Sequence, residues 1–172
     1  MKIGKNMHHD RRSLLTVLPA LAVAGVAQAE TRPGPIDLPK TEFIYESLVT
    51  LGPVQQVGDS PFGRRVRIPI TGGTFAGPRI RGTILPSGED WQLQRPDGFT
   101  VVEASYWLQT DDGAIIHIVN KGVAGKDYAR TTPWFEAPTG PHQWLNEAVF
   151  TGTLAPVPGR TDAVIIRVFK IV

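Results

Sequence analysis

The sequence predicts an all-β protein: a single antiparallel meander closed into a small barrel of about eight to ten strands, lipocalin-like in outline. Three observations predict it. Alternating apolar and polar residues recur from residue 41 to the C-terminus, as in strands with one buried face. Three short turns between these runs each end in glycine, at Gly88, Gly98 and Gly113, which is typical of antiparallel hairpins. No segment keeps a helical apolar period for more than two turns.

Residues 1–29 are predicted to be an export signal peptide. Basic residues precede an apolar run from Leu14 to Gly25, and Ala27-Gln28-Ala29 offers small residues for cleavage. The pair Arg11-Arg12 resembles a twin-arginine leader, and the general export pathway is the alternative. The apolar run is too short for a retained membrane anchor. We therefore expect a periplasmic or secreted protein after cleavage.

Removing this leader changes the charge balance. The chain of 172 residues has a formal net charge of +2, but its leader holds four basic residues and one acid. The remainder, at −1, gives no electrostatic support for binding nucleic acid or a membrane surface. The chain has no cysteine and keeps only His117 and His142 after cleavage, so we expect no disulfide and no metal site. No nucleotide or flavin fingerprint is present, so no cofactor is expected.

The barrel domain is expected to span residues 41–172, after a proline-rich linker at 30–40. A first strand is predicted at 41–51, followed by a turn-rich segment at 55–63. The stretch 70–82 contains four glycines and is predicted to be a sharp β-corner needed for closure, and it could also line a site.

The remaining strands must hide their edges, for which barrel closure is the expected solution and a two-sheet sandwich the alternative. A polar loop is expected at 121–128, and a loop with one helical turn at 138–146. Further strands are predicted at residues 64–70, 79–85, 90–94, 100–110, 114–120, 129–137, 148–154 and 163–172.

Several separated motifs carry a family resemblance. They run in order from Ile68-Pro69-Ile70-Thr71-Gly72-Gly73-Thr74-Phe75 through Asp90-Trp91-Gln92 and Arg130-Thr131-Thr132-Pro133 to Trp144-Leu145-Asn146. The sequence from about Phe43 to Val172 thereby resembles the domain-of-unknown-function 3237 family. The resemblance implies a compact antiparallel β-barrel and no single established activity.

Three charged residues are the candidate catalytic groups: Asp90, Glu136 and Arg130. An inward Asp90 in an apolar interior would have a raised pKa, which suits a general acid or base. The alternative is a carboxylate that caps the nearby turn. Arg130 and Glu136 share parity on a strand, so both would face the same way. Facing inward, they could hold an oxyanion and move a proton; the alternative is a structural ion pair.

Further residues are candidates for holding a substrate. Tyr106 alternates with apolar neighbours, so its hydroxyl could orient a ligand or meet a backbone carbonyl in the core. The tryptophans offer stacking surfaces, and polar neighbours offer hydrogen bonds. The predicted substrate-binding set is Tyr106, Trp91, Trp134, Thr132, Arg79 and Asn146.

Two functions of different classes fit these residues. The first is a cofactor-independent lyase, hydratase or isomerase that acts on a small aromatic or oxygenated molecule inside the barrel. The alternative is a non-catalytic, lipocalin-like binding protein, and a filled structural barrel stays open. We expect a small-molecule ligand, and the sequence leaves open whether the chain forms a homo-oligomer. The discriminating observation is whether Asp90, Arg130 and Glu136 converge on one cavity.

Overall fold

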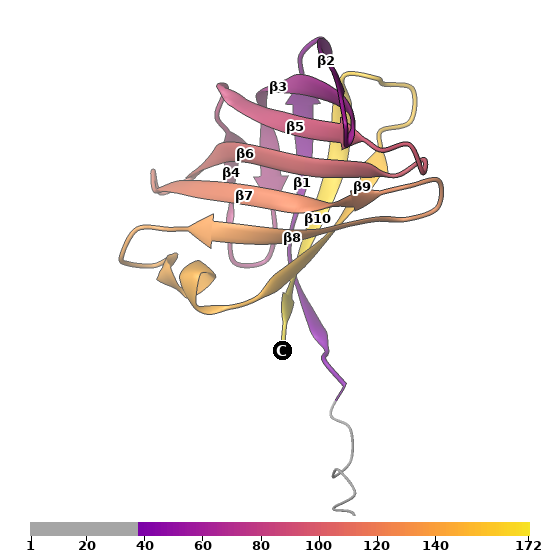
Figure 1. The fold of residues 1–172 in the computed structure, drawn as a ribbon. Coiled ribbons are helices and arrows are strands. Elements are labelled where there is room, and N and C mark those ends of the chain that lie inside the picture. Colours follow the sequence, from indigo (N-terminus) through magenta and orange to yellow (C-terminus); the bar gives the residue numbers. More distant parts are fainter. Residues whose placement is uncertain (1–37) are drawn as a thin grey trace, which may run out of the picture. The chain divides into compact units, whose positions relative to one another are not determined.

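The computed structural model describes residues 38–172, which form one antiparallel sheet of ten strands that closes on itself (Figure 1). The predicted signal peptide and residues 30–37 of the predicted linker lie outside the described residues. The elements are β1 (Thr41–Leu51), β2 (Gln55–Ser60), β3 (Gly63–Ala76), β4 (Arg81–Ile84), β5 (Gly88–Gln94), β6 (Thr100–Thr110), β7 (Ile115–Ala124), β8 (Ala129–Glu136), the 3₁₀ helix η1 (Gln143–Glu147), β9 (Phe150–Pro156) and β10 (Ala163–Ile171).

The barrel has eight strand positions, two of which are each shared by two strands. Between β3 and β6, β5 pairs with the first half of β3 and β4 with its last residues. On the other side of β3, β2 pairs with the first half and β1 with the second. The pairing of β1 with both β10 and β3 closes the ring. The predicted closed barrel is thereby confirmed, and the sandwich alternative does not apply.

The glycine-rich stretch is where β3 exchanges its partners. The strand continues through Gly72 and Gly73, whose φ angles of 142° and 140° are disfavoured for other residues. A Cβ at Gly73 would lie far inside contact distance of the Leu48 carbonyl oxygen on β1. The register of β1 against β3 shifts between Thr50 and Leu51. The predicted corner is therefore a bend within one long strand, with its end at Ala76.

The strand β2 was not expected, because residues 55–63 were predicted to be turn-rich. Every residue of β2 except Ser60 is exposed, so this strand has no apolar alternation to reveal it. Its pairing with β3 includes a register shift between Gln56 and Gly58. Similarly, β7 continues to Ala124, into the segment predicted to be a polar loop.

Aromatic side chains fill one end of the barrel. Tyr45 packs against Phe75 and Phe135, with ring centroids 5.4 and 6.3 Å apart, and Phe135 meets Phe150 at 5.0 Å. Leu145 of η1 is buried in the same cluster. Such tilted and edge-on aromatic contacts bury large apolar areas. This end of the barrel is therefore solidly packed.

The segment that carries η1 is held to the barrel by two polar contacts. Asn146 accepts a hydrogen bond from the Ala137 backbone N–H and donates one to its carbonyl, both at 2.8 Å. His142 Nε2 lies 2.9 Å from Asp112 Oδ2 in the β6–β7 turn. Hydrogen bonds to Thr110 and His142 lower the pKa of Asp112. The helical turn expected near residues 142–146 is thus a cover fixed to the packed end.

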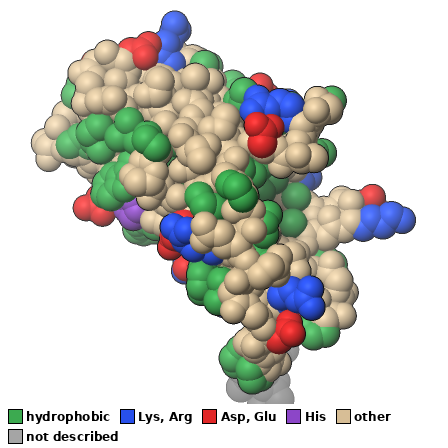
Figure 2. Space-filling model, turned by 90° about the horizontal axis from the view of Figure 1, so that it is seen from above, with side chains coloured by type: hydrophobic (Ala, Val, Ile, Leu, Met, Phe, Trp, Pro, Cys, Tyr) green, Lys and Arg blue, Asp and Glu red, His purple; other side chains and the backbone are tan. Residues whose placement is uncertain are grey.

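The surface carries mixed charges. Figure 2 shows acidic and basic side chains close together on one face, without a large patch of one sign. Ion pairs such as Arg64–Asp59, Lys121–Glu103 and Arg167–Glu46 account for part of this mixing. No helix within residues 38–172 has the length and hydrophobicity to cross a membrane.

Candidate functional site: a polar-walled cavity inside the barrel

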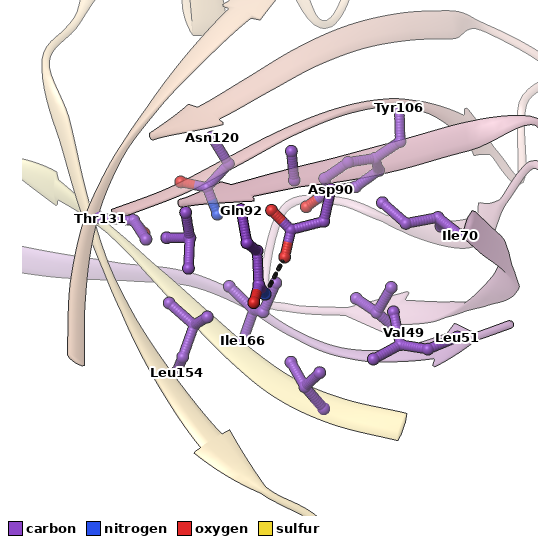
Figure 3. A pocket seen from close by; sticks show the side chains of 13 residues that line it. Val49, Leu51, Ile70, Asp90, Gln92, Tyr106, Asn120, Thr131, Leu154 and Ile166 are labelled. Carbon is purple, nitrogen blue, oxygen red and sulfur yellow. Dashed lines mark hydrogen bonds between the residues drawn. The ribbon is translucent and has the colours of Figure 1, made fainter. Parts of the chain in front are cut away.

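A cavity of about 70 Å³ lies inside the barrel, beyond the packed aromatic end (Figure 3). This is room for several water molecules or a small part of a ligand. One wall carries polar groups from β5, β6, β7 and β8, and the other is apolar. The lining residues are Val49, Leu51, Ile70, Asp90, Gln92, Val102, Ala104, Tyr106, Asn120, Thr131, Leu154, Val164 and Ile166.

Strand pairing places the polar wall. Asp90 on β5 pairs with Ala104 on β6, and Ala104 pairs with Asn120 on β7. The three side chains therefore form one row across three strands, with the small Ala104 leaving space between two polar neighbours. Thr131 of β8 stands opposite Gly122, where a Cβ would collide with the Arg130 carbonyl oxygen, so β7 and β8 approach closely at this point. The strand register thereby gathers the polar side chains on one wall of the cavity.

Among residues 38–172, Asp90 is the one carboxyl group that lines the interior cavity. Its Oδ2 accepts a hydrogen bond from Gln92 Nε2 at 2.5 Å, and its Oδ1 accepts one from the Glu103 backbone N–H at 3.1 Å. Burial raises the pKa of Asp90, and the two hydrogen bonds only partly oppose that effect. The backbone partner lies on β6, so the carboxylate does not cap the turn before it.

Tyr106 brings a hydroxyl group to the same cavity. The side chain is 1% exposed, and Figure 3 shows its hydroxyl end directed toward Asp90. Within residues 38–172 this hydroxyl has no hydrogen-bond partner. Burial, and then the nearby Asp90 carboxylate, raise the pKa of Tyr106, so the phenol keeps its proton at neutral pH.

Two more polar atoms of the wall lack partners in the described chain: Asn120 Oδ1 and Thr131 Oγ1. Both side chains are buried, at 2% and 3% exposure. An unpaired buried polar atom costs about 1–3 kcal/mol, so proteins retain such groups where a ligand or water completes them. Three of these unpaired polar atoms surround one cavity, which makes that cavity the candidate binding site.

Four predicted site residues on β8 do not reach this cavity. Arg130, Thr132, Trp134 and Glu136 share one face, as their parity predicts, but all four are exposed on the outside of the barrel. Their inward neighbours are Thr131, Pro133 and Phe135, which are all buried. The Arg130 guanidinium donates to the Ala129 carbonyl and lies 5.5 Å from the Tyr128 ring centroid. Asp90, Arg130 and Glu136 therefore do not converge.

Three other predicted substrate-binding residues also lie outside the cavity. Trp91 is on the outer face of β5, with the Arg65 guanidinium 5.8 Å from its ring centroid. The Arg79 guanidinium lies 4.2 Å from the Trp144 ring centroid, next to η1. Asn146 holds the Ala137 backbone, as described above. Of the nine predicted site residues, Asp90 and Tyr106 line the cavity.

Sequence reasoning missed Gln92, Asn120 and Thr131. Asn120 and Thr131 are polar residues at inward positions of strands whose neighbouring inward residues are apolar, whereas Gln92 follows the inward Asp90 at two-residue spacing. Asn120 follows Ile116 and Ile118 at two-residue spacing, and Thr131 precedes Pro133 and Phe135 in the same way. A lone polar residue on an apolar face was the available signal.

No cluster of metal ligands accompanies this wall. Within the part of the chain that the structure describes, His, Asp and Glu side chains do not gather in threes that could hold a metal ion. The arrangement offers one carboxyl, one phenol, two amides and one hydroxyl. Such groups can bind an oxygenated molecule and transfer a proton.

The profile of one protein family, described as a protein of unknown function (DUF3237), matches residues 39–171. The chain belongs to the DUF3237 family. A relative from Rhodopseudomonas palustris, called a UPF0311 protein, is 32% identical over 150 residues, which cover 77% of this chain and 96% of the relative. A DUF3237 relative from Penicillium herquei, named hydroalkoxylation enzyme phnH, is 30% identical over 138 residues, covering 80% of this chain and 87% of the enzyme.

Solved structures agree with the fold of this DUF3237 protein. A β-barrel-like protein from Acinetobacter baumannii superposes with a TM-score of 0.74 at 31% identity, covering 83% of this chain and all of that one. The structure of an enzyme from Penicillium herquei gives a TM-score of 0.68 at 26% identity, covering 83% of this chain and 98% of that one. The eight-position barrel is therefore shared with solved relatives.

Proposed function

We propose that this DUF3237 protein is a cofactor-independent enzyme of the lyase, hydratase or isomerase type. Its substrate is a small aromatic or oxygenated molecule bound inside the barrel. The observation that carries the proposal is the Asp90 carboxyl, with its raised pKa, in a cavity whose Tyr106 hydroxyl has no partner. A carboxyl group whose pKa moves toward neutrality can both give and take a proton.

The polar wall divides the work between its groups. Asp90 transfers the proton, and Gln92 holds one of its oxygens in place. Tyr106 donates its free hydroxyl proton to an oxygen on which negative charge develops, as an oxyanion-stabilising group does. Asn120 and Thr131 present unpaired oxygens to the hydroxyl groups of the substrate.

The named activity of the Penicillium herquei relative is consistent with this chemistry. Hydroalkoxylation adds an alcohol across a carbon–carbon double bond: the O–H and π bonds break, and C–O and C–H bonds form. The net change is one proton moved from oxygen to carbon, with no oxidant or reductant. A single carboxyl that accepts the first proton and delivers it to carbon satisfies this balance.

The test combines a binding screen with proton exchange. A thermal-shift screen of phenols, aromatic acids and lactones identifies ligands that raise the melting temperature. Each ligand is then incubated with the protein in deuterated water, and mass spectrometry follows the incorporation of deuterium at carbon. We expect Asp90→Asn to slow incorporation by about 10²–10⁴-fold. Glu136→Gln, which changes a carboxyl on the outer face, is the matched control and should not slow it.

The same experiment separates the enzyme from the binding protein. Ligands that stabilise the wild type without exchanging deuterium or forming product would leave the lipocalin-like alternative. Equal exchange in the wild type and Asp90→Asn would remove Asp90 from the mechanism.

A further inference from the structure

The interior cavity continues into a larger depression at one end of the barrel. The depression has a volume of about 490 Å³ and shares Leu51, Leu154 and Val164 with the interior cavity. These three residues come from the end of β1, the end of β9 and the start of β10. Figure 1 shows the β9–β10 loop and η1 at opposite ends of the barrel, so the depression lies away from the packed end. The three shared residues therefore form the mouth of the cavity.

The depression is predominantly apolar. Apart from the three mouth residues, its lining is Ala129, Ala155, Pro156, Arg160, Thr161 and Ala163. Arg160 is paired with Asp162 through two hydrogen bonds, at 2.8 and 2.9 Å. The Arg160 charge is thus balanced within the protein, so this surface does not favour an anionic group on the ligand. Alanine and proline side chains favour contact with hydrocarbon.

The interior cavity has one polar wall and one apolar wall. Figure 3 shows Asp90, Gln92 and Asn120 on one side and Val49, Leu51, Leu154 and Ile166 on the other. A continuous apolar surface therefore extends from the apolar wall through the mouth and into the depression. The interior alone is small for a ligand pocket, because such pockets typically measure about 300–1,000 Å³. Interior and depression together fall within this range.

We propose that the ligand has two parts: an oxygenated head on the polar wall, and an apolar arm that leaves between Leu51, Leu154 and Val164 and lies in the depression. The substrate class is an amphiphilic phenol or similar hydroxylated ring with an alkyl or aryl substituent. This inference rests on the proposed function for the position of the head, and it adds the arm and its path.

The experiment measures binding of 4-alkylphenols, from phenol to 4-hexylphenol, by isothermal titration calorimetry. Each methylene buried in the depression should tighten the dissociation constant by up to about fourfold in the wild type. Ala129→Trp places an indole in the depression from an inward position of β8. In this variant the gain with chain length should disappear, while phenol itself binds within about twofold of the wild type.

The matched control is Val149→Trp, which adds the same side chain at an exposed position beside η1, where Trp134 and Ile171 line a separate groove. This variant should keep the full chain-length gain. Phenol binding to Ala129→Trp also shows that the variant is folded.

The outcomes separate this inference from the proposed function. A chain-length gain that Ala129→Trp abolishes supports the two-part ligand, even if no ligand exchanges deuterium and the enzymatic proposal fails. Suppose that phenol binds but affinity does not increase with chain length, or that Ala129→Trp leaves the increase intact. Either result would refute the proposal that an apolar arm lies in the depression, without bearing on the proposed catalytic cavity. Failure of the whole series to bind also refutes the proposal of an apolar arm.

Discussion

Asp90 shows how one residue can be unfavourable for stability and useful for chemistry. Its carboxyl is held by only two hydrogen bonds, from Gln92 and the Glu103 backbone, in a cavity with mainly apolar walls. Burial penalises the charged form and raises the pKa. A pKa closer to neutral pH lets the carboxyl exchange protons readily. It also means that ionisation of the carboxyl is costly in the folded state.

The raised pKa of Asp90 predicts the pH dependence of stability. Because the pKa of Asp90 is higher in the folded than in the unfolded chain, the folded state binds more protons between the two values. The contribution of Asp90 to stability is therefore fully present below the unfolded value, is lost as pH rises through the window, and stays lost above the folded value. Asp90→Asn removes the titration. Urea unfolding at several pH values measures the free energy of unfolding of both proteins. As pH rises, that of the variant should increase relative to that of the wild type. A difference between the two that does not change with pH would contradict the raised pKa.

At the scale of one element, β3 determines how the barrel closes. Its first half pairs with β2 and β5, and its second half with β1 and β4. The exchange takes place at Gly72 and Gly73, where the backbone has positive φ and passes close to β1. Two divided strand positions are the result. A residue with a Cβ would oppose both the backbone conformation and the close approach.

Two glycine variants separate these effects. Gly58 in β2 has a φ angle of 131° and open space around it, so Gly58→Ala tests the backbone cost alone, about 1–2 kcal/mol. Gly73→Ala adds a collision with the Leu48 carbonyl and should destabilise by about 3 kcal/mol or more. The free energies of unfolding from denaturant titration provide the comparison. Equal losses in the two variants would mean that β1 moves away from Gly73 without cost.

The whole molecule combines a packed end with a hollow one. Tyr45, Phe75, Phe135 and Phe150 fill the barrel near η1, and the cavity and its mouth occupy the other end. The completely buried Ile116 and Ile118 of β7 belong to the same core cluster. By contrast, β2 is almost entirely exposed and pairs only with β3 among the described strands. Local stability should therefore vary strongly across one continuous sheet.

Native-state hydrogen exchange tests this variation. Amides of β7 around Ile116 and Ile118 should be among the slowest to exchange, because their opening requires disruption of the packed end. Amides of β2 should be the fastest among the strands. Exchange by β2 at the rate of β7 would show that the barrel opens only as a unit.

Local patterns predicted the barrel better than they predicted the cavity. Period-two alternation and the turns at Gly88, Gly98 and Gly113 indicated most strands, because these signals depend on residues close in sequence. The exposed β2 gave no such signal. Absolute orientation was harder: Arg130 and Glu136 do share a face, but parity alone does not state whether that face is inside. Only the ring of eight positions decides that Thr131 faces the cavity.

The division into a packed and a hollow end also bears on how readily this barrel can be redesigned. Leu51, Leu154 and Val164 are partly exposed at the mouth, and their remaining surface packs against the hydrophobic core cluster. Substitutions that keep these positions apolar should preserve that packing while they change the shape of the mouth. A combinatorial library of apolar residues at these three positions, with the packed end unchanged, would therefore vary ligand preference without altering the aromatic part of the core.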